Sequence, residues 1–352
     1  MYDNPIVGDD LDGLVAHPRL DWERLRNRTV LVTGINGMIA SYLLLTLLRL
    51  NDRRDLGVRV VGVARNESKA RQRFAAVVDR PDLTLVAQDL AEPLRHEGAV
   101  DLVVHAASQT SPQHFTTDPV GTIDGNVLGT RNLLQWSHDH GVGQFLFLST
   151  REIYGGNPEG REFVTEDQYG PIDPTAIRSC YPESKRLGEA YCVGFRSQYG
   201  LDTRIARIAH SYGPGMVIGD GRVVGDFLRC TVDGTDIAMI SDGSGRLALT
   251  YIADVIAGLF LFLQTDETLV NISQDEQVVT IRELAELLAE LNPNPDAAVV
   301  FAPAPASVHA GYLARPPAFL ASSRIAAHGW APATGLRDGM ARTVAYLRGA
   351  GS

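Results

Sequence analysis

The stretch at residues 33–40, TGINGMIA, constrains the fold of this chain more than any other. It lies between two apolar runs, residues 29–32 and 41–48, which predict a buried strand and a buried helix. Gly34 can adopt the positive φ of a tight turn, and Gly37 has no Cβ to keep a pyrophosphate from the amides at the helix N-terminus. The order of strand, glycine turn and helix therefore predicts a phosphate-binding site.

Charge and cysteine content narrow the class of protein. The chain has 352 residues, 45% of them hydrophobic, enough for one large domain or two interlocked ones. A net charge of −10 argues against a nucleic-acid surface, and three cysteines without metal-type spacing predict neither disulfides nor a metal site. The N-terminus lacks the regions of a signal peptide, and no apolar run approaches the roughly 20 residues of a membrane span. We therefore expect a soluble, cytoplasmic protein with no nucleic-acid or membrane partner.

Strand-like and helix-like segments alternate over the first 150 residues. After the opening unit, strands are predicted at residues 58–64, 83–86, 101–108 and 144–148, with a helix through residues 126–134. This alternation predicts a parallel, doubly wound sheet. Ligands of such sheets bind beyond the carboxyl ends of the strands.

The residues after the second and third strands bear on the choice of cofactor. Arg65 and Asn66 occupy the position where NAD-selective sites carry a carboxylate for the ribose hydroxyl. An arginine that holds a 2′-phosphate favours NADP or tolerance of both cofactors. Because Arg65 can also stack on adenine or face solvent, NAD and NADP both stay open. Asp89 can accept from the adenine amino group. His105, at the end of the fourth strand, is expected to be a packed histidine and not a metal ligand.

A second group of polar residues follows the fifth strand. Thr150 ends that strand, and Tyr181 and Lys185, four residues apart, share one face of the next helix. An ammonium beside a phenol lowers the phenol's pKa from roughly 10, as does a positive nicotinamide ring. Such a tyrosine can remove the proton of a substrate alcohol while hydride leaves the same carbon, with Thr150 holding the alcohol. Each feature alone has an ordinary explanation, but their order together indicates hydride transfer.

These features together resemble an extended short-chain dehydrogenase/reductase of the NAD-dependent epimerase/dehydratase family, which modifies nucleotide sugars. The resemblance runs from Thr29 to residues 328–332, HGWAP. It implies a tightly bound, recycled NAD or NADP, a catalytic set matched by Thr150, Tyr181 and Lys185, a C-terminal subdomain that holds the nucleotide diphosphate, and a homodimer. The residues expected to contact the cofactor are Gly34, Asn36, Gly37, Met38, Ile39, Arg65, Asn66, Asp89, Leu90, Ala106, Ala107, Ser108, Asn126, Ser149, Tyr181 and Lys185.

Within the family, residues 178–186 and the preceding residues 166–174 are most similar to the UDP-glucuronate decarboxylases. In those enzymes, C4 oxidation creates a β-keto acid that loses carbon dioxide before hydride returns. Glu152 matches a glutamate that decarboxylases and 4,6-dehydratases share, and it joins the expected catalytic set. Arg151 fits neither group. Dehydratases carry an aspartic acid there, and an arginine cannot donate its proton usefully, so dehydration ranks lower.

Arg151 leaves three interpretations open. It can bind a substrate carboxylate or phosphate in bidentate fashion, or it can face solvent. A clamped carboxylate is stabilised before its loss, which favours an epimerase over a decarboxylase.

Three further residues are expected to meet the substrate. His210 lies in a turn that the resemblance places between nicotinamide and substrate, and we favour a hydrogen-bond donor over a second acid or base. Arg222 resembles the family's diphosphate-binding arginine. At residues 241–247 the family's second phosphate arginine aligns with Leu247. Arg246 comes one residue earlier and is expected on the opposite face of a strand.

The expected fold is α/β, a Rossmann-like doubly wound parallel sheet with a smaller C-terminal α/β substrate-binding subdomain. The expected parts are an N-terminal arm at 1–27, a cofactor domain at 28–209 with 248–275 returning to it, and a substrate subdomain at 210–247 and 276–352. Thr280 and Glu283 predict a capping box before a helix, and the proline-rich residues 303–305 and 315–317 predict surface loop.

The expected activity is decarboxylation of a nucleotide-diphosphate hexuronate through transient C4 oxidation. The alternatives are a 4-epimerase and a net NADP-dependent reductase of a small carbonyl compound. A non-enzymatic NAD(P) sensor ranks last, because Tyr181 and Lys185 are present.

Overall fold

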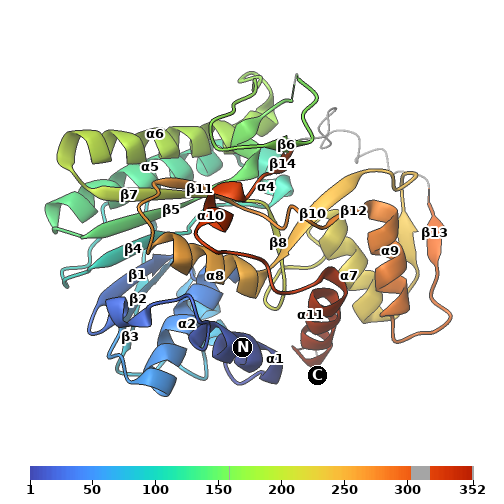
Figure 1. The fold of residues 1–352 in the computed structure, drawn as a ribbon, viewed down its shortest axis with the longest axis horizontal. Coiled ribbons are helices and arrows are strands. Elements are labelled where there is room, and N and C mark those ends of the chain that lie inside the picture. Colours follow the sequence, from blue (N-terminus) through green and yellow to red (C-terminus); the bar gives the residue numbers. More distant parts are fainter. Residues whose placement is uncertain (158, 303–317, 351–352) are drawn as a thin grey trace.

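A seven-stranded, wholly parallel sheet forms the centre of the molecule in the computed structural model, which describes residues 1–157, 159–302 and 318–350 (Figure 1). Its strand order is β11-β7-β5-β4-β1-β2-β3, so the order reverses between β1 and β4. The doubly wound sheet predicted from the sequence is confirmed, and its crevice lies at this reversal. The strands are β1 (Thr29–Thr33), β2 (Arg59–Ala64), β3 (Leu83–Ala87), β4 (Leu102–His105), β5 (Gln144–Thr150), β7 (Asp202–Ile208) and β11 (Leu269–Ile272).

Helices cover both faces of this sheet. All five residues of β1 are buried, which is typical of a parallel strand packed on both sides. One face carries α1, α2 and α8 and the other carries α5 and α6 (Figure 1). The helices of this larger body are α1 (Pro5–Val15), α2 (Met38–Arg54), α3 (Glu67–Arg73), α4 (Pro112–Thr117), α5 (Pro119–Asp139), α6 (Cys180–Tyr199), α8 (Ile252–Phe262) and α10 (Ser323–Ala327), with 3₁₀ turns η1 (Trp22–Leu25), η2 (Arg151–Tyr154) and η3 (Ile177–Ser179).

The first 27 residues pack against the larger body as a helix and a 3₁₀ turn. Asn4 caps α1 with its side chain and Pro5 occupies the first helical turn, both good helix starts. Trp22 lies edge-on against Phe260 of α8, with ring centroids 4.8 Å apart. The buried Asp10 accepts from two tyrosines and pairs with an arginine of the last helix, so this segment joins distant parts of the chain.

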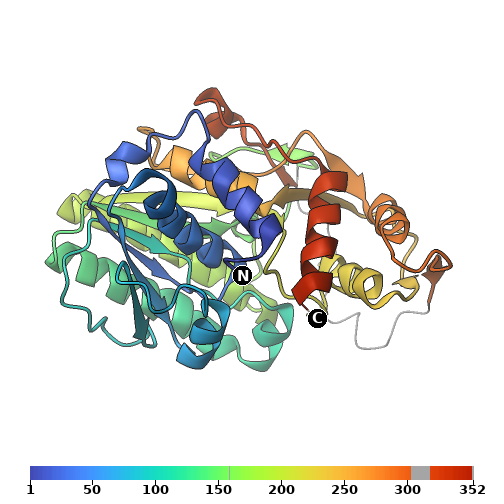
Figure 2. The ribbon, with the colours of Figure 1, turned by 90° about the horizontal axis from the view of Figure 1, so that it is seen from below.

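A smaller lobe stands beside the carboxyl edge of the sheet. It contains α7 (Val223–Asp233), β9 (Ile237–Met239), α9 (Ile281–Glu290), β13 (Val299–Phe301) and α11 (Leu336–Ala350). Figure 2 shows α11 between the larger body and the rest of this lobe. In this lobe β9 pairs with β13. Two further small sheets lie within the described residues, one of β8 (His210–Tyr212), β10 (Arg246–Tyr251) and β12 (Val278–Thr280), the other of β6 (Phe163–Val164) and β14 (Phe319–Leu320).

Several local predictions can be compared with these elements. The capping box is confirmed: Thr280 accepts from the backbone N–H of Glu283, whose carboxylate accepts in return. His105 is a packed histidine, hydrogen-bonded to Thr33 and Thr130. The proline-rich residues 303–305 and 315–317 lie outside the described residues. Within the part of the chain that the structure describes, no helix has the length and apolar character of a membrane span.

Candidate active site

The glycine turn follows β1 and packs against the end of β4, and the strand order reverses between these two strands. Gly34 has a φ of +71°, and a Cβ at this position would lie 2.6 Å from the Cα of Ala107. The Thr33 hydroxyl accepts from the backbone N–H groups of Ala106 and Ala107 at 3.1 and 3.0 Å. Only glycine combines this φ with so close an approach of the backbone. The turn after β1 is thereby fixed against the end of β4.

The start of α2 has the features of a pyrophosphate site. Gly37 is its N-cap and no side chain caps the helix, so the first amides are free to donate. Asn36 donates from Nδ2 to the carbonyl of Asn66 at 3.0 Å, while its buried Oδ1 has no partner among the described residues. Met38 and Ile39, also predicted to contact the cofactor, begin the helix at this place. The residues present fit the dinucleotide that the sequence implies.

The end of β2, where an adenosine ribose is expected, carries no carboxylate of its own. Arg65 is exposed, and its guanidinium lies 3.8 Å from the carboxylate of Asp89. Asn66 caps α3 by accepting from the N–H of Lys69 at 2.9 Å. The helix cap occupies the side-chain oxygen of Asn66 and Asn36 occupies its carbonyl, so its side-chain amide Nδ2 is the group left to contact a ligand, and its predicted role stays a prediction.

Most of the side chains predicted near the nicotinamide are hydrogen-bonded to one another, and Ser149 is the exception. Ser108 donates to Asn126 at 2.7 Å, and Asn126 donates to Ser184 of α6 at 2.9 Å. Ser149, in contrast, is buried and donates to Glu189 at 2.5 Å. The hydroxyl has thus used its one donor, and the predicted contact of Ser149 with the cofactor stays a prediction. The Leu90 side chain is likewise part of the core.

Helix α6 brings the predicted catalytic tyrosine and lysine to the end of β5. The Tyr181 ring stacks on Phe115, with centroids 4.6 Å apart and planes at 14°. Its hydroxyl interacts with the side chains of Thr150 and Ser108. Lys185 is 3% exposed and donates from Nζ to the carbonyl of Leu148 at 2.6 Å. Three predicted residues, Thr150, Tyr181 and Lys185, thus converge at the carboxyl edge of the sheet.

The electrostatics of Tyr181 differ from the expectation. Burial raises the pKa of the Tyr181 phenol, and the charge of Glu152 raises it further, against the lowering effect of hydrogen bonds from Thr150 and Ser108. Burial also lowers the pKa of Lys185 from 10.5 to about 8. The prediction that the ammonium depresses the phenol pKa is wrong for the chain by itself, because the ammonium is directed to a backbone carbonyl and the phenol is desolvated.

A buried ion pair links helix α6 to strand β7. Arg207, 1% exposed, pairs with Glu189 at 2.7 Å and donates to the Tyr154 hydroxyl at 2.9 Å. Sequence reasoning missed this pair and also missed Phe115. The one signal for Glu189 is its position one helical turn after Lys185.

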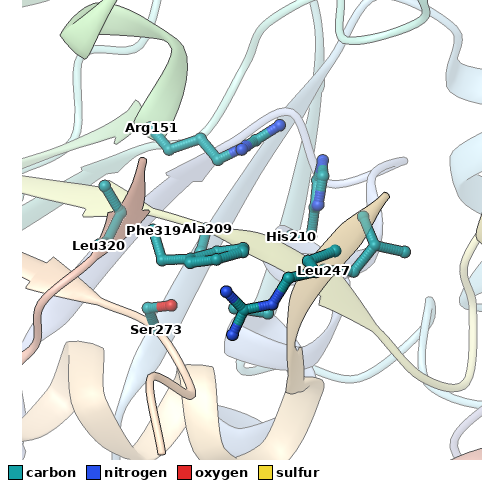
Figure 3. Close-up of a pocket in the computed structure, with 9 residues that line it drawn as sticks. Arg151, Ala209, His210, Leu247, Ser273, Phe319 and Leu320 are labelled. Carbon is teal, nitrogen blue, oxygen red and sulfur yellow. The ribbon is translucent and has the colours of Figure 1, made fainter. Parts of the chain in front are cut away.

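Arg151 lies on a small cavity just past Thr150, with atoms of Arg246 and Leu247 in the wall (Figure 3). In Figure 3 the Arg151 guanidinium extends toward the His210 ring. The charge of Arg151, then burial, then the charge of Arg222 lower the pKa of His210 well below its usual value, so the imidazole is neutral. Arg246 begins β10 as an exposed residue, Leu247 is half-buried, and the expectation that the two side chains point to opposite faces stays a prediction.

Three other predicted charges already have partners. Arg222, before α7, pairs with Asp220 at 2.6 Å, and its charge reaches both Tyr181 and His210. Arg246 pairs with Glu162 at 2.7 Å. The carboxylate of Glu152 lies 3.8 Å from the guanidinium of Arg178.

The fold and the site together define a dinucleotide-dependent enzyme of the dehydrogenase/reductase class. The model of the NAD dependent epimerase/dehydratase family matches residues 30–273, and the chain belongs to this family. It is an NAD-dependent enzyme, as the family description implies.

Relatives with assigned activities agree with this placement. UDP-glucuronic acid decarboxylase 1 of Arabidopsis thaliana is 31% identical over 93% of this chain and 70% of that protein. Decarboxylase 6 of the same plant is 34% identical over 75% of this chain and 74% of that protein. The structure of a dTDP-glucose 4,6-dehydratase from Streptomyces venezuelae with NAD bound has a TM-score of 0.75 at 26% identity, over 91% of this chain and 97% of the other.

Proposed function

We propose that this chain oxidises C4 of a nucleotide-diphosphate hexuronate of the UDP-glucuronate type, lets carbon dioxide leave, and returns the hydride from the same cofactor. The convergence of Thr150, Tyr181 and Lys185 beside the glycine turn carries the proposal. The similarity to UDP-glucuronic acid decarboxylases supports the choice of substrate.

Tyr181 is the proposed base for the C4 hydroxyl, with Thr150 holding that oxygen in line. Bound NAD supplies the hydride acceptor, and its positive ring offsets the burial that raises the pKa of Tyr181. Lys185 lies one helical turn after Tyr181, with its ammonium fixed on the Leu148 carbonyl. Tyr181 returns the same proton when the ketone is reduced.

The β-keto acid formed at C4 needs no further oxidant to lose its carboxylate. The C5–C6 bond breaks, its electron pair moves into the C4 carbonyl to give an enolate, and carbon dioxide leaves. C5 then takes a proton. That proton comes from solvent, and Glu152, whose carboxylate is held near Arg178, is our candidate to bind the water that supplies it.

The remaining parts of the chain receive roles by the same reasoning. Residues 28–209 and 248–275 bind the cofactor, and residues 210–247 and 276–352 bind the nucleotide diphosphate, with Arg222 and Arg246 as its contacts.

The protein is proposed to be a cytoplasmic homodimer. Six of the exposed large apolar side chains lie on the adjoining helices α5 and α6, which suits an interface: Val120, Ile123, Leu128, Leu187, Val193 and Tyr199.

Incubation with UDP-glucuronate and mass analysis of the nucleotide sugars tests the proposal. We expect a UDP-pentose and no net change in cofactor absorbance. Absence of turnover with UDP-glucuronate contradicts it.

Two specific observations favour other outcomes. Arg151 favours 4-epimerisation with the carboxylate retained, which gives a product of unchanged mass. Arg65 at the ribose position and Leu247 at the usual phosphate-arginine position favour a net NADP-dependent reductase, which consumes NADPH in proportion to product.

A further inference from the structure

Three polar side chains without partners meet at the cavity beyond Thr150. The Arg151 guanidinium makes no hydrogen bond or ion pair with any residue in the described ranges, and the same holds for the His210 ring. Ser273 is 0% exposed, and its hydroxyl has no hydrogen-bond partner there either. All three line one cavity although they come from different segments: the start of η2, strand β8 and the segment after β11 (Figure 3).

The chemistry of this set is that of a receptor for a carboxylate. The Arg151 guanidinium feels the charge of Glu152 but forms no ion pair within the described residues, and its planar fork matches two carboxylate oxygens. Neutral His210 and Ser273 can each donate one further hydrogen bond to an anion. The remaining wall includes Phe319 and Leu320, which exclude water and strengthen a charge-assisted bond.

The position beside Thr150 selects which anionic group of the substrate reaches the cavity. Thr150 holds the C4 oxygen in the proposed reaction, so a group bound by the next residue must sit on a carbon adjacent to C4. C5 is adjacent and carries C6, the carboxylate carbon of a hexuronate. The diphosphate is attached to C1, across the sugar ring from C4. A carboxylate at C6 therefore fits beside Arg151, while the diphosphate is left to Arg222 and to Arg246 in another part of the cavity wall.

We infer that Arg151, His210 and Ser273 bind the C6 carboxylate of the sugar and make the enzyme selective for hexuronates over neutral hexoses. This inference rests on the proposed C4 chemistry and names the determinant of its substrate class. Loss of carbon dioxide moves negative charge from the carboxylate to the C4 oxygen. Arg151 stabilises the charge before that movement and slows the breaking of the C5–C6 bond relative to an uncharged residue.

Binding measured without turnover tests this assignment. In a Tyr181→Phe background loaded with NAD, calorimetry gives the dissociation constants of UDP-glucuronate and UDP-glucose. Arg151→Met should weaken UDP-glucuronate binding about 10- to 100-fold, as expected for a charge-assisted bond, and leave UDP-glucose within about 3-fold. Ser273→Ala, which removes no bond seen within the described residues, should weaken UDP-glucuronate alone by about 3- to 10-fold.

Arg337→Met is the matched control, because Arg337 is an exposed arginine of α11 paired only with Glu290 among the described residues. It should change neither constant. Equal weakening of both ligands by Arg151→Met, or no weakening of UDP-glucuronate, overturns the inference. If the Tyr181→Phe protein does not bind UDP-glucuronate at all, the proposed substrate is wrong. If it binds UDP-glucuronate but Arg151→Met has no selective effect, only the inference about the carboxylate site is wrong.

Discussion

At the scale of single residues, the surroundings of Tyr181 oppose the loss of its phenol proton. Burial and the charge of Glu152 both raise its pKa, and its ring is stacked on Phe115. A positive charge beside the phenol would lower its pKa, so in the proposed reaction the bound cofactor would help Tyr181 to act as the base.

Removal of the Tyr181 hydroxyl should abolish the proton transfer and leave substrate binding nearly unchanged. We expect Tyr181→Phe to lower kcat by roughly 10²- to 10⁴-fold, the usual contribution of general base catalysis. Nucleotide-sugar affinity should change little, because the stacked ring remains. Steady-state kinetics together with binding by calorimetry measures both quantities. A variant that retains a tenth or more of wild-type kcat argues against Tyr181 as the base.

The buried Lys185 should cost stability in a pH-dependent way. Its pKa falls from 10.5 to about 8 on folding, so the charged ammonium costs about 3 kcal/mol at pH 7. Between pH 8 and 10.5 the unfolded chain binds more protons than the folded one, and the contribution of Lys185 therefore becomes less unfavourable as pH rises.

Lys185→Met should accordingly be more stable than wild type at pH 7, by about 2 kcal/mol after the lost bond to Leu148 is subtracted. The advantage should shrink at pH 9.5, and activity should be lost at both values. Urea unfolding at the two pH values measures the difference. An advantage of equal size at both would contradict the burial of a charged lysine.

At the scale of elements, the turn between β1 and α2 depends on one glycine. Gly34→Ala places a Cβ at positive φ against the backbone of Ala107. We expect a loss of more than about 2 kcal/mol in unfolding free energy, together with loss of bound NAD.

The matched control for this change is Gly13→Ala in α1, where a Cβ meets nothing within 4 Å. It should raise stability by about 0.5 to 1 kcal/mol, as a helical glycine-to-alanine change does. Thermal unfolding and the cofactor content of the purified proteins measure both effects. Equal stabilities for the two variants would show that the turn tolerates a side chain.

The sequence predicted these elements well where the signal was local. Continuous apolar runs indicated the buried parallel strands, and the glycine spacing indicated the turn between β1 and α2. Helix α1 was missed, because its acidic residues hide the apolar face that packs on α2 and α8.

Contacts between distant segments could not be predicted in this way. Ser273 meets Arg151 only because β11 returns beside β7, and Glu189 meets Arg207 only across α6 and β7. The direction of the Tyr181 pKa shift also depends on burial, which no spacing of residues reports.

At the scale of the whole molecule, the exposed apolar side chains of α5 and α6 predict the mode of assembly. Leu128→Arg on α5 should shift the proposed homodimer toward monomer, because a charge is placed in an apolar interface. Val300→Arg on β13 is the control and should leave the mass unchanged. Light scattering after size exclusion measures both. A wild-type protein that is monomeric at all concentrations would remove this role from α5 and α6.

The central claim is that one cofactor takes a hydride from C4 and gives it back within the same turnover. UDP-glucuronate carrying deuterium at C4, incubated with the protein and no added cofactor, measures this directly by mass spectrometry and NMR. We predict that the product, whether UDP-pentose or the 4-epimer, keeps the deuterium at C4 over many turnovers. A product that has lost the deuterium, or product formation limited to the amount of added NADPH, would contradict the account.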